Sequence, residues 1–186
     1  MVLFARNRRY YLIPVEHKKE IFGDIFDKHQ NLIGRIRTNK KDMIIVTEVN
    51  GTICLRIKEY GSKRYTIEDH FGNYLGNVLV PKRRHEKLIV EDRFGKKILS
   101  TRGFVEWVFT IQNERSKKIA VGCTTNLMFS IDKRGTQHGK PSFLFSVRPH
   151  HPDSRFLLAI FIILLKKMRR TDITELYVKF GPAIPL

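Results

Sequence analysis

The sequence has few cysteines, few acidic residues and no apolar segment of bilayer-spanning length. Its two cysteines, Cys54 and Cys123, lie far apart and form no CxxC pair, so we expect two core thiols rather than a disulfide framework or a zinc knuckle. No apolar stretch with a small-residue cleavage site follows the N-terminus, which predicts a cytoplasmic protein without a secretory signal. Only 12 Gly and 7 Pro occur in 186 residues, which excludes collagen-like and low-complexity chains.

The net charge of the chain is strongly positive. Lys and Arg number 35 and Asp and Glu number 18, which gives a formal net charge of +17. Such an excess predicts a polyanionic partner, either a nucleic acid or a membrane surface that carries anionic lipid. A chain of 186 residues fits one domain, so we assign residues 1–186 to a single domain.

Residues 9 to 147 show the pattern of short β-strands. β-Branched and aromatic residues occur in short runs that are separated by Gly, Asn and Asp. The segment MIIVTEVNGTICLRIKEY predicts a hairpin, in which Asn50 and Gly51 would supply the two positive φ angles of a type I′ turn. Helical periodicity is absent from this region, so the chain is predicted to be mainly β.

One unit recurs about once every twenty residues. It consists of a strand, an acid or amide, a polar turn and a second strand. Asp and Asn suit such turns because their side chains accept hydrogen bonds from the backbone that follows. No single turn holds enough carboxylates for a calcium site, and no metal site or cofactor is predicted. The recurring residues are Asp27, Asp69, Asp92, Asn113 and Asp132.

Near the C-terminus, a helix is predicted over residues 154–169. Its apolar run, Phe156 to Leu165, would span only about 15 Å, too short to cross a membrane. A helix that is apolar all round must be buried all round, so we expect a closed antiparallel barrel of many strands around it. A β-sandwich with the helix across one end is the alternative, and residues 171–186 would add a strand or a tail. The helix core is predicted to comprise Phe156, Leu157, Ile160, Phe161, Ile163 and Leu164.

The repeated units IFDKHQNLIGRIR, IEDHFGNYLGNVL and IVEDRFGKKILST, followed by the hydrophobic helix RFLLAIFIILLKK, resemble the tubby C-terminal-like superfamily. This superfamily includes tubby proteins, phospholipid scramblases and the plant LURP-one-related proteins. The resemblance implies a twelve-stranded antiparallel barrel around a central C-terminal helix, and phosphoinositide headgroups as the class of ligand. The cysteine cluster and acidic calcium segment of scramblases are missing here, so calcium-controlled scrambling is not expected.

Basic residues occur in pairs and triplets within the predicted turns. The densest cluster is Lys82, Arg83 and Arg84, which could bind a phosphorylated headgroup because Arg pairs with phosphate through two hydrogen bonds. Further candidates for binding an anionic headgroup or polyanion are Lys63, Arg64, Lys96 and Lys97.

These observations predict a non-catalytic, intracellular module that binds anionic phosphate groups, in particular phosphoinositide or other anionic lipid headgroups at the inner face of a membrane. One alternative is a non-specific nucleic-acid-binding protein, in which basic residues would line a groove and neighbouring aromatic rings would stack on bases. The candidates are Arg9-Tyr10-Tyr11, Lys63-Arg64-Tyr65 and His70-Phe71. A second is a scramblase-like, lipid-handling protein without calcium control. No nucleophile elbow, Walker A or Rossmann glycine pattern occurs, so we do not expect an enzyme.

Overall fold

The computed structural model describes residues 9–17, 20–39, 43–61, 63–80, 88–105, 108–131, 137–147 and 154–167. These residues form twelve strands and one helix, α2 (Ser154–Lys167). The strands are β1 (Arg9–His17), β2 (Glu20–Phe26), β3 (Leu32–Asn39), β4 (Met43–Glu48), β5 (Ile53–Tyr60), β6 (Arg64–Glu68), β7 (Tyr74–Leu79), β8 (Ile89–Asp92), β9 (Lys97–Val105), β10 (Val108–Asn113), β11 (Lys118–Ile131) and β12 (Gln137–Val147). The predictions of a mainly β chain and of a helix beginning at residue 154 are confirmed, whereas residues 171–186 lie outside the described part.

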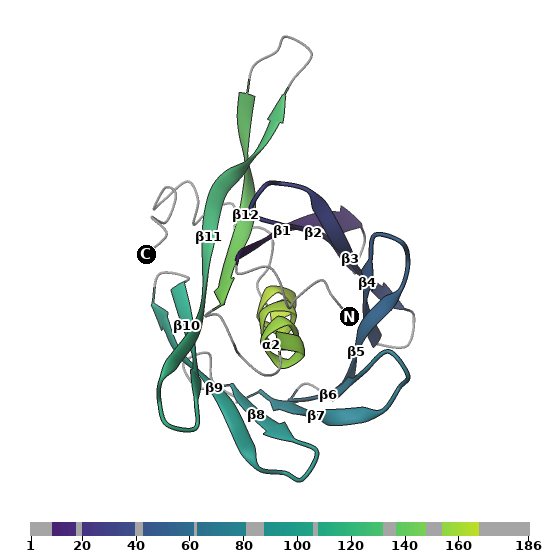
Figure 1. Cartoon of the computed structure of the whole chain (residues 1–186), viewed down its shortest axis with the longest axis vertical. Helices are drawn as coiled ribbons and strands as arrows, with labels where there is room; N and C mark the ends of the chain where they lie inside the picture. Colours follow the sequence, from purple (N-terminus) through teal and green to yellow (C-terminus); the bar gives the residue numbers. More distant parts are fainter. Residues whose placement is uncertain are drawn as a thin grey trace.

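Every strand pairs antiparallel with the next strand in the chain, as a meander does. β1 also pairs with β12, from Arg9 opposite Ser146 to Leu12 opposite Phe143. Figure 1 shows the strands arranged as a ring with α2 inside it. The helix therefore lies where the strands can surround it.

The inner face of the sheet follows from the two-residue period of a strand, since alternate side chains point to opposite faces. In β4, Ile44 and Val46 are buried while their neighbours are partly exposed. Val46 lies opposite Leu55 of β5, and Ile57 of β5 lies opposite Ile67 of β6. Such cross-strand pairs of branched aliphatic side chains form the wall that packs around the helix.

The helix is buried on every side. All nine residues from Phe156 to Leu164 are at most 5% exposed, which covers more than two full turns. The six residues predicted as the helix core are among them. This burial explains why the helix needs no polar face across its middle.

Five hairpins have the same type of turn. In each, the first turn residue accepts a backbone hydrogen bond from the fourth at 2.9–3.1 Å, and its own N–H donates to the carbonyl of the fifth. The fourth residue always has a positive φ. The first and fourth residues are Asp27 and Gln30, Glu48 and Gly51, Asp69 and Gly72, Asp92 and Gly95, and Asn113 and Ser116.

Each of these hairpins also skips one apolar residue on its second strand, which produces a bulge. The bulge explains why Cys54 and Leu55, although consecutive, are both buried. Burial raises the pKa of the Cys54 thiol to about 11, so this cysteine behaves as a core side chain. The equivalent bulge residues are Ile33, Leu75, Ile98 and Ile119.

The predicted hairpin between β4 and β5 is confirmed, but its predicted type I′ turn is wrong. Of the turn residues, Gly51 has a positive φ of 89° and Asn50 does not. A type I turn followed by one left-handed residue, Gly51, forms instead. Within it, the Asn50 side chain accepts the N–H of Thr52 at 2.9 Å. Asn50 thus acts through its side-chain oxygen rather than through its tolerance of positive φ.

Candidate anion-binding surface

The order of strands places all five of these turns at one end of the sheet. In an antiparallel meander, connections from an even strand to the next odd strand share one end, and the others share the opposite end. We call the end that holds the even-to-odd connections the turn end. It comprises residues 27–31, 48–52, 69–73, 92–96 and 113–117. The four later turns can be followed around the perimeter of the ring in Figure 1.

The structure does not bring the predicted basic residues together. Lys96 and Lys97 lie at the turn end, where β9 begins, whereas Lys63 and Arg64 lie at the opposite end, where β6 begins. Five-residue β6 alone separates the two ends by about 17 Å. Lys63, Arg64, Lys96 and Lys97 are all exposed, so two separate basic surfaces exist.

Lys82, Arg83 and Arg84, the densest predicted cluster, lie outside the described residues. β7 finishes and β8 begins at the end of the sheet that also holds Lys63. Val80, which follows β7, donates its N–H to the carbonyl of Lys63 at 2.7 Å. Nearby, the Arg64 guanidinium donates to the Asn77 side chain at 3.2 Å.

The acidic side chains of the turns are directed into their own backbone. Asp69 Oδ1 accepts the N–H groups of Phe71 and Asn73, each at 2.9 Å, and its Oδ2 accepts the Asn73 amide at 3.0 Å. Asp27 makes the same set of contacts, and Asp92 accepts two backbone N–H groups. Asp27 and Asp69 are both buried. These carboxylates therefore serve the turns rather than the surface.

Other acids are engaged within the sheet. Glu59 of β5 accepts a hydrogen bond from the buried Tyr65 hydroxyl at 2.8 Å and forms an ion pair with Lys166 of α2. Burial, followed by this hydrogen bond and the Glu59 charge, raises the pKa of Tyr65. Glu68 pairs with Lys58 across β5 and β6 at 2.6 Å.

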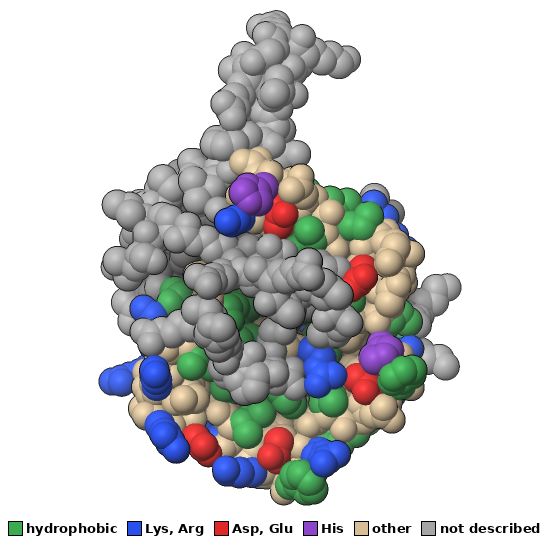
Figure 2. Space-filling model, in the orientation of Figure 1, with side chains coloured by type: hydrophobic (Ala, Val, Ile, Leu, Met, Phe, Trp, Pro, Cys, Tyr) green, Lys and Arg blue, Asp and Glu red, His purple; other side chains and the backbone are tan. Residues whose placement is uncertain are grey.

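Exposed basic side chains outnumber exposed acidic ones. Among the residues whose exposure the structure describes, ten Lys and Arg are exposed but Glu114 is the one exposed acid. Even Glu114 is paired, at 3.2 Å, with Lys96. Figure 2 shows basic side chains along the lower edge of the face in view, with acidic and hydrophobic ones between them. The ten are Lys28, Arg37, Lys63, Arg64, Arg93, Lys96, Lys97, Arg102, Arg115 and Lys117.

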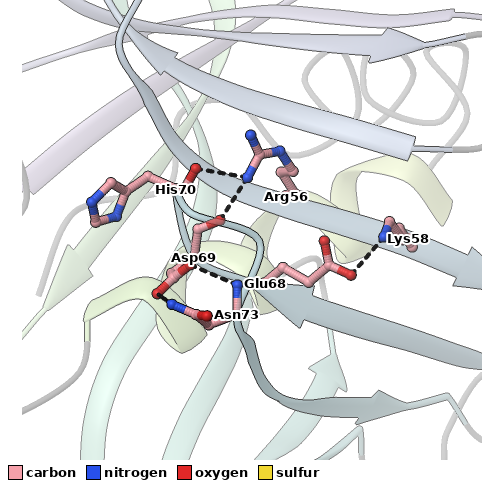
Figure 3. Close-up of polar contacts among 6 residues, drawn as sticks. All are labelled: Arg56, Lys58, Glu68, Asp69, His70 and Asn73. Carbon is pink, nitrogen blue, oxygen red and sulfur yellow. Dashed lines mark hydrogen bonds and ion pairs between the residues drawn. The ribbon is translucent and has the colours of Figure 1, made fainter.

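One cation of the turn end has a structural role. The Arg56 guanidinium donates through Nη1 to the carbonyls of Asp69 and His70, at 3.0 and 2.8 Å. Figure 3 shows it reaching from its strand to the turn that Asp69 and Asn73 close. Arg56 therefore holds the 69–73 turn from outside while Asp69 holds it from within.

Two aromatic side chains project from the turn end. Phe71 and Phe94 are each 78% exposed, and both occupy the third position of their turn. Tyr65, by contrast, is 2% exposed, so its predicted stacking on nucleic-acid bases is wrong: its ring faces the core opposite Val78. The repeat offered a signal for Phe94, because DHFGN and DRFGK align, but only the structure reveals the exposure.

No helix of the described residues is long and apolar enough to span a bilayer. Within the same residues, no group of three or more His, Cys, Asp or Glu is placed to hold a metal ion.

Comparisons with known proteins bear on the fold. No protein-family model matches the chain, and no curated protein matches it. A protein of Arabidopsis thaliana, solved by X-ray crystallography, has a similar structure, with a TM-score of 0.59 and 15% sequence identity. The similarity covers 89% of this chain and 95% of the plant protein. At this identity the comparison shows a shared fold.

Proposed function

We propose that this protein is a non-catalytic intracellular module that binds anionic phosphate groups, specifically phosphoinositide or other anionic lipid headgroups at a membrane surface. The observation that carries the proposal is the separation of charge by the fold. Asp27, Asp69 and Asp92 are engaged in turns, and Glu59 and Glu68 in ion pairs, while ten Lys and Arg of the described residues are exposed. Each basic residue near an anionic leaflet contributes about 1 kcal/mol to binding.

The proposal includes a closed barrel and membership of the tubby-like superfamily. The pairing of β1 with β12 supports closure, as does the burial of α2 on every side. The similar plant structure supports the fold over nearly the whole chain. A rigid barrel would present cations at both ends without ordering a loop when a headgroup binds, which favours affinity.

Sedimentation with vesicles tests the proposal. The purified chain is mixed with vesicles of phosphatidylcholine alone, with added phosphatidylserine, or with added phosphoinositide, at about 150 mM salt where the Debye length is about 8 Å. We expect the protein to pellet with both anionic compositions and not with the neutral one. Parallel tubes with excess single-stranded DNA should leave the protein on the anionic vesicles.

Two variants compare exposed cations with a paired one. Replacing Lys97 and Lys117, which are exposed at the end of the sheet that carries the five turns, with Glu should weaken binding to anionic vesicles. Arg35→Ala, which removes the partner of Asp24 at 3.8 Å, should leave binding nearly unchanged. A chain that ignores every anionic vesicle refutes the proposal. Release from vesicles by DNA would favour the nucleic-acid alternative instead.

A further inference from the structure

The turn end carries two aromatic side chains that the turns themselves do not require. The third position of the shared turn is His29, Asn50 and Arg115 in three hairpins, but Phe71 and Phe94 in the other two. Turns favour small or polar residues, so neither ring is explained by turn chemistry. Both rings are also outside the core, at 78% exposure. Their position therefore calls for a partner outside the chain.

The two rings belong to adjacent hairpins. Phe71 lies in the β6–β7 turn and Phe94 in the β8–β9 turn, and β7 pairs with β8. Adjacent hairpins are separated by two strand spacings, about 10 Å. Both rings can therefore reach the same flat surface at once.

Each ring carries a basic companion from the preceding residue. The Arg93 guanidinium lies over the Phe94 ring at 4.6 Å from its centroid. The His70 ring lies beside Phe71, with 3.8 Å between centroids. A ring paired with a basic group is amphipathic, which suits the boundary between lipid headgroups and acyl chains.

The two turns that carry Phe71 and Phe94, whose outermost residues we call the tips, are held in place before any partner binds. Asp69 accepts the N–H of Phe71, and Asp92 accepts the N–H of Phe94, each at 2.9 Å. Arg56 adds two further hydrogen bonds to the first turn. Little backbone entropy would be lost on docking, because the turns are already ordered.

The charge of this end fits an anionic surface. Lys97 directly follows the Phe94 turn, and Arg115 and Lys117 lie in the next turn around the sheet; all three are exposed. The turn carboxylates Asp69 and Asp92 accept hydrogen bonds from their own turns. Soluble phosphate would engage the cations but would offer nothing to the phenyl rings. A bilayer offers anionic headgroups and an apolar layer together, which matches both features.

We infer that the turn end is a membrane-docking surface, on which Phe71 and Phe94 insert side by side into an anionic leaflet while the basic residues around them contact its headgroups. The inference rests on the proposed function and specifies which end of the molecule meets the bilayer. It predicts that binding depends on the two rings as well as on charge.

Vesicle partitioning of a Phe71→Ser, Phe94→Ser double variant tests this inference. We expect its partition coefficient on phosphatidylcholine–phosphatidylserine vesicles to fall by about tenfold, equivalent to 1.4 kcal/mol. Tyr60→Ser is the matched control, since Tyr60 is 57% exposed but lies at the opposite end of the sheet, where β5 finishes. Its binding should be unchanged, and circular dichroism should show that all variants are folded.

Fluorescence reports the insertion directly. The reporters are placed in a Trp107→Phe background, because the native tryptophan would otherwise contribute to the emission. There, Phe71→Trp and Phe94→Trp should each retain binding, shift their emission to the blue on anionic vesicles and be quenched by lipids brominated on the acyl chain. Tyr60→Trp should show neither change.

The outcomes separate the two proposals. Full binding by the double serine variant, or equal quenching at positions 60 and 71, would overturn the docking surface while leaving the proposed function intact. A wild-type chain that binds no anionic vesicle would overturn both. Loss of DNA binding without loss of vesicle binding would assign the rings to base stacking instead.

Discussion

Phe145 of β12 stacks on Phe161 of α2, with 4.6 Å between ring centroids and 19° between ring planes. Both side chains are buried, at 1% and 0% exposure. β12 is the last strand before the helix and pairs with β1. This contact therefore joins the helix to the strand at which the two ends of the meander meet.

Removal of the Phe161 ring should destabilise the whole fold. Phe161→Ala leaves a cavity beside Phe145, which typically costs about 3–5 kcal/mol of the free energy of unfolding. Phe161→Leu keeps most of the volume and should cost less than about 2 kcal/mol. Urea unfolding followed by circular dichroism measures both, and a loss below about 1 kcal/mol for the alanine variant would contradict central packing of the helix.

Glu59 should couple the end of the helix to the sheet. Glu59→Ala removes the acceptor of the buried Tyr65 hydroxyl and the partner of Lys166, so we expect a loss of about 1–3 kcal/mol. Tyr65→Phe should cost about 1 kcal/mol in the wild type and close to nothing in the Glu59→Ala background. Additive effects in this double-mutant cycle would show that the hydrogen bond contributes nothing to stability.

The turn carboxylates should make stability sensitive to acid. Burial raises the pKa of Asp69, but hydrogen bonds from the Asn73 side chain and from the N–H groups of Asn73 and Phe71 outweigh it, so the pKa is lowered from 3.8. Because the native pKa is the lower one, the stabilisation is present above pH 3.8 and is lost as the pH falls through the native value. The free energy of unfolding should therefore drop below about pH 4.

A matched pair of variants isolates this effect. Asp69→Asn should flatten the acid limb of the stability curve, because an amide at this position does not titrate. Asn113→Asp should steepen it, since Asn113 accepts the same two backbone hydrogen bonds in its own turn, at 3.1 and 2.9 Å. Parallel pH profiles for both variants and the wild type would exclude the turn carboxylates as the cause.

The left-handed turn position should favour glycine. Ser116 has a φ of 58°, where three other turns have Gly. Ser116→Gly relieves that strain and should stabilise the protein by about 0.5–1 kcal/mol, while Gly95→Ser should cost a similar amount. Thermal unfolding would show the two midpoints moving in opposite directions. A lower midpoint for Ser116→Gly would mean that its side chain contributes contacts of its own.

The sequence by itself determined the local and periodic features. Short runs of β-branched and aromatic residues predicted the strands, the recurring Asp and Asn predicted the turns, and the unbroken run from residue 156 predicted the buried helix. These features depend on neighbours in the chain, so their signal is present in short segments. Even the wrong turn type at Asn50 left the hairpin prediction intact, because both turn types reverse the chain.

Only the tertiary structure decided which side chains face water and which end of the molecule they occupy. The position of Lys63 and Lys96 at opposite ends follows from counting every strand between them, and the burial of Tyr65 beside exposed Arg64 follows from strand register. Likewise, the use of Asp69 and Glu59 inside the fold leaves the surface more basic than composition indicates. These outcomes depend on pairings between distant segments, and for that reason the sequence showed an excess of charge but not its arrangement.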